Sequence, residues 1–216
     1  MTFNIDEWLN LAVEKLQSAF GENLLFIGLQ GSYNRDEATP ESDIDLVVIL
    51  DNMTFEDLKL YRSIIDTMPY KEKACGFISG KNEIQKWSKS DLFQFFYDTK
   101  SLFGHLENII QPPTKNAIKQ FVKSSFENLY HVSVHSFIHS KNYIKDLQKL
   151  YKMTFFILQA KYFIETNKYI PTKNQLFELL DDIDKEILDI CIKKDFVNDN
   201  IENLYYKIIR WCLNNM

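Results

Sequence analysis

The sequence predicts an α+β protein in which a small mixed sheet with flanking helices precedes a helical bundle. Residues 24–29 and 44–50 are apolar runs with the length and aliphatic content of buried strands. Pro112-Pro113 breaks any helix that runs through it, and beyond these prolines strand-like alternation stops. We therefore expect two domains, residues 1–111 and residues 112–216.

The first half alternates between helical and strand-like patterns. Apolar residues recur at helical spacing, and the first such stretch ends at a Gly-Glu-Asn sequence. A third strand, mixed in polarity, precedes Gly80, and Ser90 is a suitable N-cap for the last helix of this half. Besides the two apolar runs, the expected elements are helices over residues 6–20, 54–68 and 82–87, a strand over 70–79 and a helix from residue 91.

The second half has helical periodicity throughout, with its main break at residues 167–173. Long neighbouring helices joined by short connections pack antiparallel in bundles. The expected helices cover residues 115–138, 141–166, 175–180, 183–191 and 201–213.

Composition excludes several classes of function. Apolar residues make up 45% of the 216 residues and no apolar run approaches the roughly twenty that span a membrane, so a cytoplasmic protein without a membrane partner is expected. The formal charge is −5 and only three of the 25 basic residues are arginine, which argues against binding of long nucleic acids. The three cysteines lack the paired spacing of a metal site or a disulfide framework.

Two acidic residues at the mouth of the second apolar run indicate a metal site. Asp43 and Asp45 are two residues apart, so on a strand they share a face. Adjacent carboxylates repel each other unless a cation lies between them, and oxygen ligands suit Mg²⁺ or Mn²⁺ completed by substrate phosphates. Alternatively, Asp43 caps a turn that begins at Pro40, although this leaves Asp45 within an apolar run.

Gly31-Ser32 follows the first strand and supplies the complement to the acidic pair. Glycine lets a phosphate approach the backbone, and serine is suited to cap a helix whose free amides would face an anion. Gly31-Ser32, ten intervening residues and Asp43-Ile44-Asp45 before an apolar strand resemble the signature of the DNA polymerase beta-like nucleotidyltransferase superfamily. Within it, the chain resembles the small bacterial branch that includes the aminoglycoside and lincosamide nucleotidyltransferases.

This resemblance implies an Mg²⁺-dependent transfer of a nucleoside monophosphate, with ATP as the expected donor, to a hydroxyl of an unidentified small-molecule acceptor. It assigns Asp43 and Asp45 to catalysis and metal binding, and Gly31, Ser32 and Arg35 to the nucleotide. It also implies that residues 1–111 form the catalytic domain. The helical residues 112–216 would bind the acceptor. In the alternative, an antitoxin-like interaction protein in which transfer is weak or lost, they would dock a partner.

The remaining candidates have competing interpretations. The resembling family supplies a third acid from the strand after the aspartate pair, and Glu72 is the acid in that stretch, yet it could equally be an exposed residue between two lysines. Lys152 is a candidate for the triphosphate or a solvated lysine. Asp98 lies near the site or caps a turn. Three histidines, which recur every four residues, offer a metal or general-base role or are solvated: His131, His135 and His139.

Overall fold

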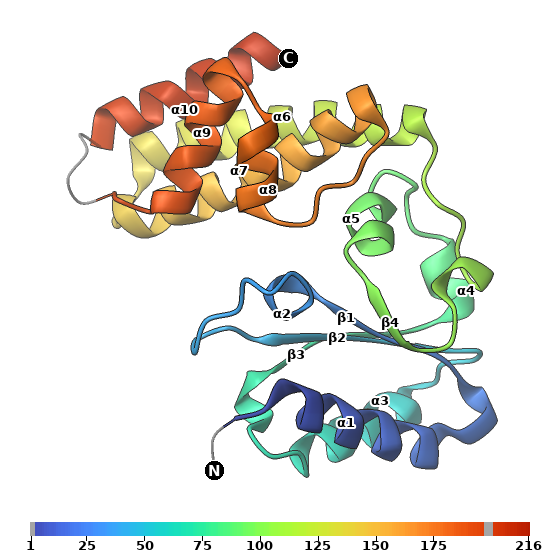
Figure 1. Cartoon of the computed structure of the whole chain (residues 1–216). Helices are drawn as coiled ribbons and strands as arrows, with labels where there is room; N and C mark the ends of the chain where they lie inside the picture. The colour runs from blue at the N-terminus through green and yellow to red at the C-terminus, as the bar shows by residue number, and fades with distance from the viewer. Residues whose placement is uncertain (1–2, 197–200) are drawn as a thin grey trace. The chain divides into compact units, whose positions relative to one another are not determined.

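The computed structural model describes residues 3–196 and 201–216, and the chain divides into two compact units, Met1–Pro112 and Pro113–Met216. The first unit contains a mixed sheet and the second is helical, which confirms the predicted α+β class (Figure 1). None of the described helices is long and apolar enough to cross a membrane.

The sheet of the first unit has the strand order β3-β2-β1-β4. β1 is antiparallel to both β2 and β4, whereas β2 and β3 run parallel with α3 in the connection between them. The strands span β1 (Leu24–Gln30), β2 (Ile44–Leu50), β3 (Ala74–Gly80) and β4 (Lys100–Phe103).

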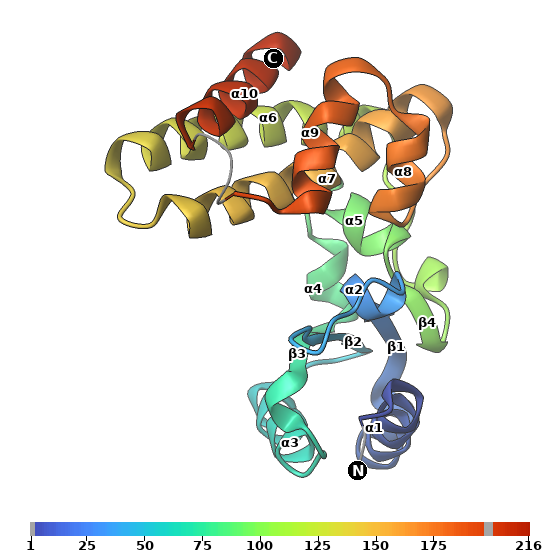
Figure 2. The same ribbon diagram turned by 60° about the vertical axis from the view of Figure 1, so that its left-hand side comes forward.

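Two apolar layers sandwich this sheet. Ile44 and Leu46 of β2 pack on one face, whereas Val47 and Ile49 pack on the other, as strand alternation requires. Figures 1 and 2 show α1 and α3 along the first face and α2 over the second. The helical segments of this unit are α1 (Ile5–Phe20), η1 (Gly21–Asn23), α2 (Gly31–Asn34), α3 (Phe55–Asp66), η2 (Lys71–Lys73), α4 (Lys81–Gln85), α5 (Leu92–Tyr97) and η3 (Leu106–Asn108).

Two local predictions for the first unit were wrong, and one strand was not predicted. β3 begins only at Ala74, because Tyr70 adopts a left-handed φ of 54° and the next three residues form the 3-10 turn η2. Asp91, not Ser90, occupies the cap position of α5, and no side chain caps that helix. β4 was not predicted, because a four-residue edge strand that begins with Lys100 lacks the apolar alternation of a strand.

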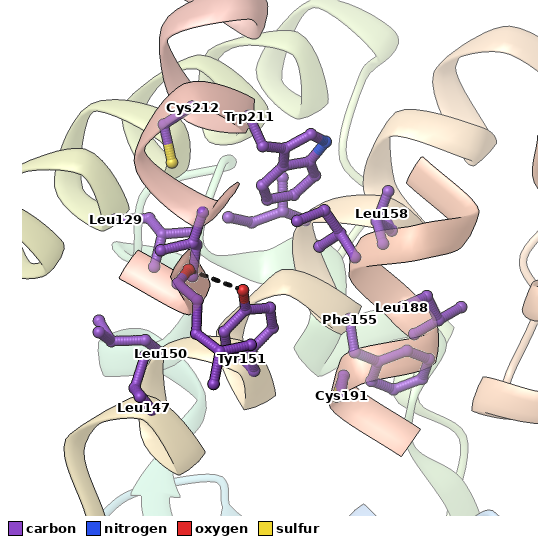
Figure 3. Close-up of a cluster of buried hydrophobic side chains, with 14 of the residues drawn as sticks. Leu129, Leu147, Leu150, Tyr151, Phe155, Leu158, Leu188, Cys191, Trp211 and Cys212 are labelled. Carbon is purple, nitrogen blue, oxygen red and sulfur yellow. Dashed lines mark hydrogen bonds between the residues drawn. The ribbon is translucent and has the colours of Figure 1, made fainter. Parts of the chain in front are cut away.

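The second unit is a helical bundle around a single cluster of buried side chains. Figure 3 shows Tyr151 within this cluster, and its hydroxyl donates to the carbonyl of Leu204 at 2.9 Å. Trp211 is fully buried and its indole Nε1 donates to Asp184 at 2.7 Å. The buried Tyr151 hydroxyl and Trp211 indole N–H therefore both have hydrogen-bond partners. The helices are α6 (Lys115–His139), α7 (Tyr143–Thr166), α8 (Lys173–Leu179), α9 (Asp182–Lys193) and α10 (Ile201–Asn215).

Candidate active site

The candidate site lies where β1 ends and β2 begins. Because the two strands are antiparallel, the C-terminal end of β1 meets the N-terminal end of β2, and Gln30 is paired with Asp45. Gly31 follows directly and opens α2, while Asp43 immediately precedes β2. The pairing of these strands therefore brings the glycine turn and the acidic pair to one edge of the sheet.

Gly31 is in direct contact with Asp45. Its φ is +74°, which is left-handed backbone that favours glycine, and a Cβ at this position would overlap the Asp45 carboxylate. Only hydrogen fits between the turn and the acid. Glycine at this position therefore has a structural reason, the close approach of the Asp45 carboxylate to the main chain, which is not the phosphate contact expected from the sequence.

Ser32 does not have its predicted capping role. α2 begins at Gly31, its cap residue is Gln30, and Ser32 lies half-buried inside the first turn. The expected helix is present, but it is only four residues long.

The two predicted catalytic aspartates differ in exposure. Asp45 is half-buried on the sheet face that also carries Val47 and Ile49, and Asp43 is exposed one residue before the strand. Together they offer carboxylate oxygens, which suit Mg²⁺ or Mn²⁺. Within the described ranges no three His, Cys, Asp or Glu side chains gather closely enough to hold a metal ion. The donor set therefore fits a cation that shares its coordination with substrate phosphates rather than one enclosed by protein.

The structure does not bring Glu72 into this group. Glu72 is exposed in η2, outside the strand on which it was expected. The β3 residue level with Asp45 is Cys75, and Phe77 follows on the face that packs with Val47. The β3 position in register with Asp45 is therefore a cysteine, and the sequence offers no acid there.

Arg35 lies at the end of α2 with 8% of its surface exposed. Its guanidinium forms an ion pair with Asp98, and its Nε lies 3.4 Å from a carboxylate oxygen of Glu37. Asp98 is also buried and accepts a hydrogen bond from the Gly31 amide at 3.3 Å. Asp98 is thus close to the Gly31 turn, and it also occupies the C-cap position of α5.

The candidates in the second unit lie on its long helices. Lys152 is an exposed residue of α7. The histidines lie along α6, all exposed, with the rings of His135 and His139 4.9 Å apart. A hollow of about 490 Å³ next to His135 is lined by both polar and apolar side chains of α6 and α7, including Asp146. Hydrogen bonds from Ser140 and Ser136 lower the pKa of Asp146 despite partial desolvation.

The sequence model of the nucleotidyltransferase domain family matches residues 9–132, more than half of the chain. The chain belongs to the nucleotidyltransferase domain family. This matched region includes the Gly31 turn and the Asp43 and Asp45 pair, so the family suggested by the sequence motif is confirmed.

A solved structure extends the likeness of this nucleotidyltransferase-family chain to nearly its full length. The crystal structure of spectinomycin adenyltransferase AAD(9) from Enterococcus faecialis, with ATP and spectinomycin, is 17% identical in sequence and has a TM-score of 0.58. The match covers 98% of this chain and 99% of the relative. At this identity the likeness shows a shared fold. No curated protein matches the sequence.

Proposed function

We propose that this protein transfers a nucleoside monophosphate from a nucleoside triphosphate to a hydroxyl of a small-molecule acceptor and releases pyrophosphate. The contact between the Gly31 turn and Asp45 carries the proposal, because it places carboxylate oxygens directly beside the main chain of a glycine turn. A phosphate can approach a glycine main chain closely, and a cation can link that phosphate to the acids. Membership of the nucleotidyltransferase domain family supports the same chemistry.

Each residue has a distinct part in this proposal. Asp43 and Asp45 hold one or two Mg²⁺ or Mn²⁺ ions together with the triphosphate, and Gly31 and Ser32 bind and orient the phosphates. When bound, the divalent cation supplies charge neutralisation and Lewis acidity at the phosphates. Glu72 is a secondary candidate for a metal contact, and Lys152 is a secondary candidate for a nucleotide contact. The substitutions Glu72→Gln and Lys152→Met test these roles.

ATP is the proposed donor and a cationic, hydroxylated small molecule is the proposed acceptor. The crystal structure of AAD(9) contains ATP and spectinomycin, and the fold is shared over nearly the whole chain. A formal charge of −5 favours a cationic acceptor over an anionic one. We assign acceptor binding to the helical unit, and we place the reaction in the cytoplasm, where the triphosphate is available.

Pyrophosphate release tests the proposal. The purified protein is incubated with Mg²⁺, each of the four nucleoside triphosphates and a panel of acceptors that includes spectinomycin. Acceptor-dependent release is expected, and Asp43→Asn or Asp45→Asn should abolish it. Glu22→Gln is the matched control, since this exposed carboxylate lies in η1 at the opposite edge of the sheet. Release that persists in the doubly substituted protein would exclude this mechanism.

A second candidate is an interaction protein with the nucleotidyltransferase fold and weak or absent transfer. Two observations favour it: the described residues place Cys75, not an acid, level with Asp45, and they gather no three metal-ligating side chains. This alternative predicts that Mg²⁺-ATP produces no stabilisation and that no acceptor supports turnover. Transfer to any acceptor that depends on Asp43 would exclude it.

A further inference from the structure

Asp98 connects the α5–β4 corner to both ends of the short helix α2. One of its carboxylate oxygens accepts from the Gly31 amide at 3.3 Å and from the Arg35 guanidinium. Its backbone carbonyl accepts from the Asn34 side chain at 2.8 Å. Asp98, which follows α5, therefore contacts Gly31, Asn34 and Arg35. Gly31 and Asn34 are the first and last residues of α2, and Arg35 is the residue after it.

The residue before the turn is connected to the same corner. The Gln30 side-chain amide donates to the hydroxyl of Thr99 at 2.6 Å and to the carbonyl of Phe95 at 3.2 Å. Figures 1 and 2 show α2 and α5 on the same side of the sheet, opposite α1 and α3. The α5–β4 corner thus contacts the chain immediately before Gly31 as well as after it.

A four-residue helix needs such contacts. Forming a first helical turn fixes several backbone dihedrals for one hydrogen bond, so an isolated turn of this length is unstable in water. The backbone bond from the Arg35 amide to the Gly31 carbonyl, 3.2 Å long, closes that single turn. Its conformation therefore depends on interactions with residues far along the chain, and Asp98 supplies the charged ones.

Because the Arg35–Asp98 ion pair is buried, each charge depends on the other for compensation. The two residues are 8% and 6% exposed, and removal of one partner leaves the other charge desolvated without compensation. Arg35 also has Glu37 beside its Nε. The guanidinium is therefore engaged by two acids of its own unit rather than directed outward to a phosphate.

We propose that Asp98 and Arg35 are positioning residues of the site, which act by fixing the Gly31-Ser32 turn against Asp45. This assigns Arg35 an indirect role, in contrast to the nucleotide contact expected from the sequence. The proposal rests on the proposed function for its effect on nucleotide, but its effect on the turn is measurable in the free protein.

Amide hydrogen exchange tests the conformational part without nucleotide. In Asp98→Ala, exchange of the Gly31 amide should accelerate about tenfold or more, since a charge-assisted acceptor is lost. The α1 amides should be unchanged, which verifies that the first unit is folded in the variant, and Asp98→Asn serves if the alanine variant does not fold. Asp66→Asn, which breaks the exposed pair with Lys71, is the control. Unchanged Gly31 exchange in a folded Asp98 variant would overturn the proposal.

A double-mutant cycle on Mg²⁺-ATP affinity tests how Arg35 acts. If Arg35 acts through Asp98, Arg35→Gln weakens binding in the natural protein by about tenfold but adds little in the Asp98→Asn background. Equal loss in both backgrounds would show direct contact with nucleotide and overturn the assignment. If the natural protein binds no nucleotide, the proposed function fails, and Gly31 exchange alone then decides the positioning role.

Discussion

The Asp45 carboxylate occupies the space that a Cβ on Gly31 would take. This contact joins the end of β1 to the start of β2 and places the acid against the main chain of the turn. A methyl group there would displace either the carboxylate or the turn, so the two residues depend on each other.

Gly31→Ala should therefore abolish stabilisation by Mg²⁺-ATP in a thermal melt. The substitution adds the overlap with Asp45 to the strain of a left-handed φ of +74°. Gly21→Ala is the matched control, because Gly21 is also left-handed, at +50°, yet nothing lies within 4 Å of its Cβ position. Equal loss of the nucleotide response in both variants would assign the effect to backbone strain alone.

Cys75 should report on site occupancy through its reaction with a maleimide. Of the three cysteines, Cys75 is exposed, whereas Cys191 and Cys212 are buried, and burial raises the pKa of the Cys212 thiol to about 12. Because Cys75 is level with Asp45, bound Mg²⁺-ATP should slow its modification several-fold. The rate is followed by intact-mass spectrometry, with Cys75→Ser as the control for specificity. A rate indifferent to nucleotide in the natural protein would place the ligand elsewhere.

Tyr61 should make the protein less stable as the pH rises from 10 to 12. Burial, assisted by the negative charge of the nearby Cys75 thiolate, raises the Tyr61 pKa from 10.0 to about 12, so the folded state retains a proton that the unfolded state loses. This contribution is complete below pH 10 and is lost as the pH passes about 12, by roughly 2–3 kcal/mol. Urea unfolding of Tyr61→Phe should show a shallower decline over this window. Parallel declines for both proteins would contradict the assignment.

Leu158→Ala should destabilise the helical unit by about 2–5 kcal/mol, because it opens a cavity in the cluster shown in Figure 3. Leu213→Ala is the same change at a helical residue that is 46% exposed, and it should alter the free energy of unfolding by less than about 0.5 kcal/mol. Urea denaturation followed by circular dichroism measures both. Similar values for the two variants would contradict the packing described for this unit.

Local patterns in the sequence were sufficient for the fold class and for the elements that carry the aspartates. β2 spans residues 44–50 as predicted, and β1 extends one residue beyond its predicted end, because apolar runs bounded by polar turns report strands directly. The proximity of the Gly31 turn to Asp45 then follows from antiparallel pairing.

The buried Arg35–Asp98 pair could not be derived in this way. The two residues are 63 positions apart, and Asp98 lies in the corner between α5 and β4, a four-residue edge strand without a recognisable pattern. Glu72 was misplaced for a related reason, since the left-handed turn at Tyr70 delays β3 and leaves the acid outside the strand. From the sequence alone, a basic residue next to a glycine turn suggests a phosphate contact. The structure shows that Arg35 is instead paired with Asp98.

Calorimetric titration with Mg²⁺-ATP tests the central claim most directly, because it measures binding at the Gly31 turn and the aspartates without knowledge of the acceptor. The account predicts saturable binding to the natural protein and to Glu22→Gln. It also predicts loss of that binding in Asp43→Asn/Asp45→Asn, with the fold retained by circular dichroism. Binding of equal affinity in the doubly substituted protein would contradict the assignment of these aspartates to the metal-nucleotide site.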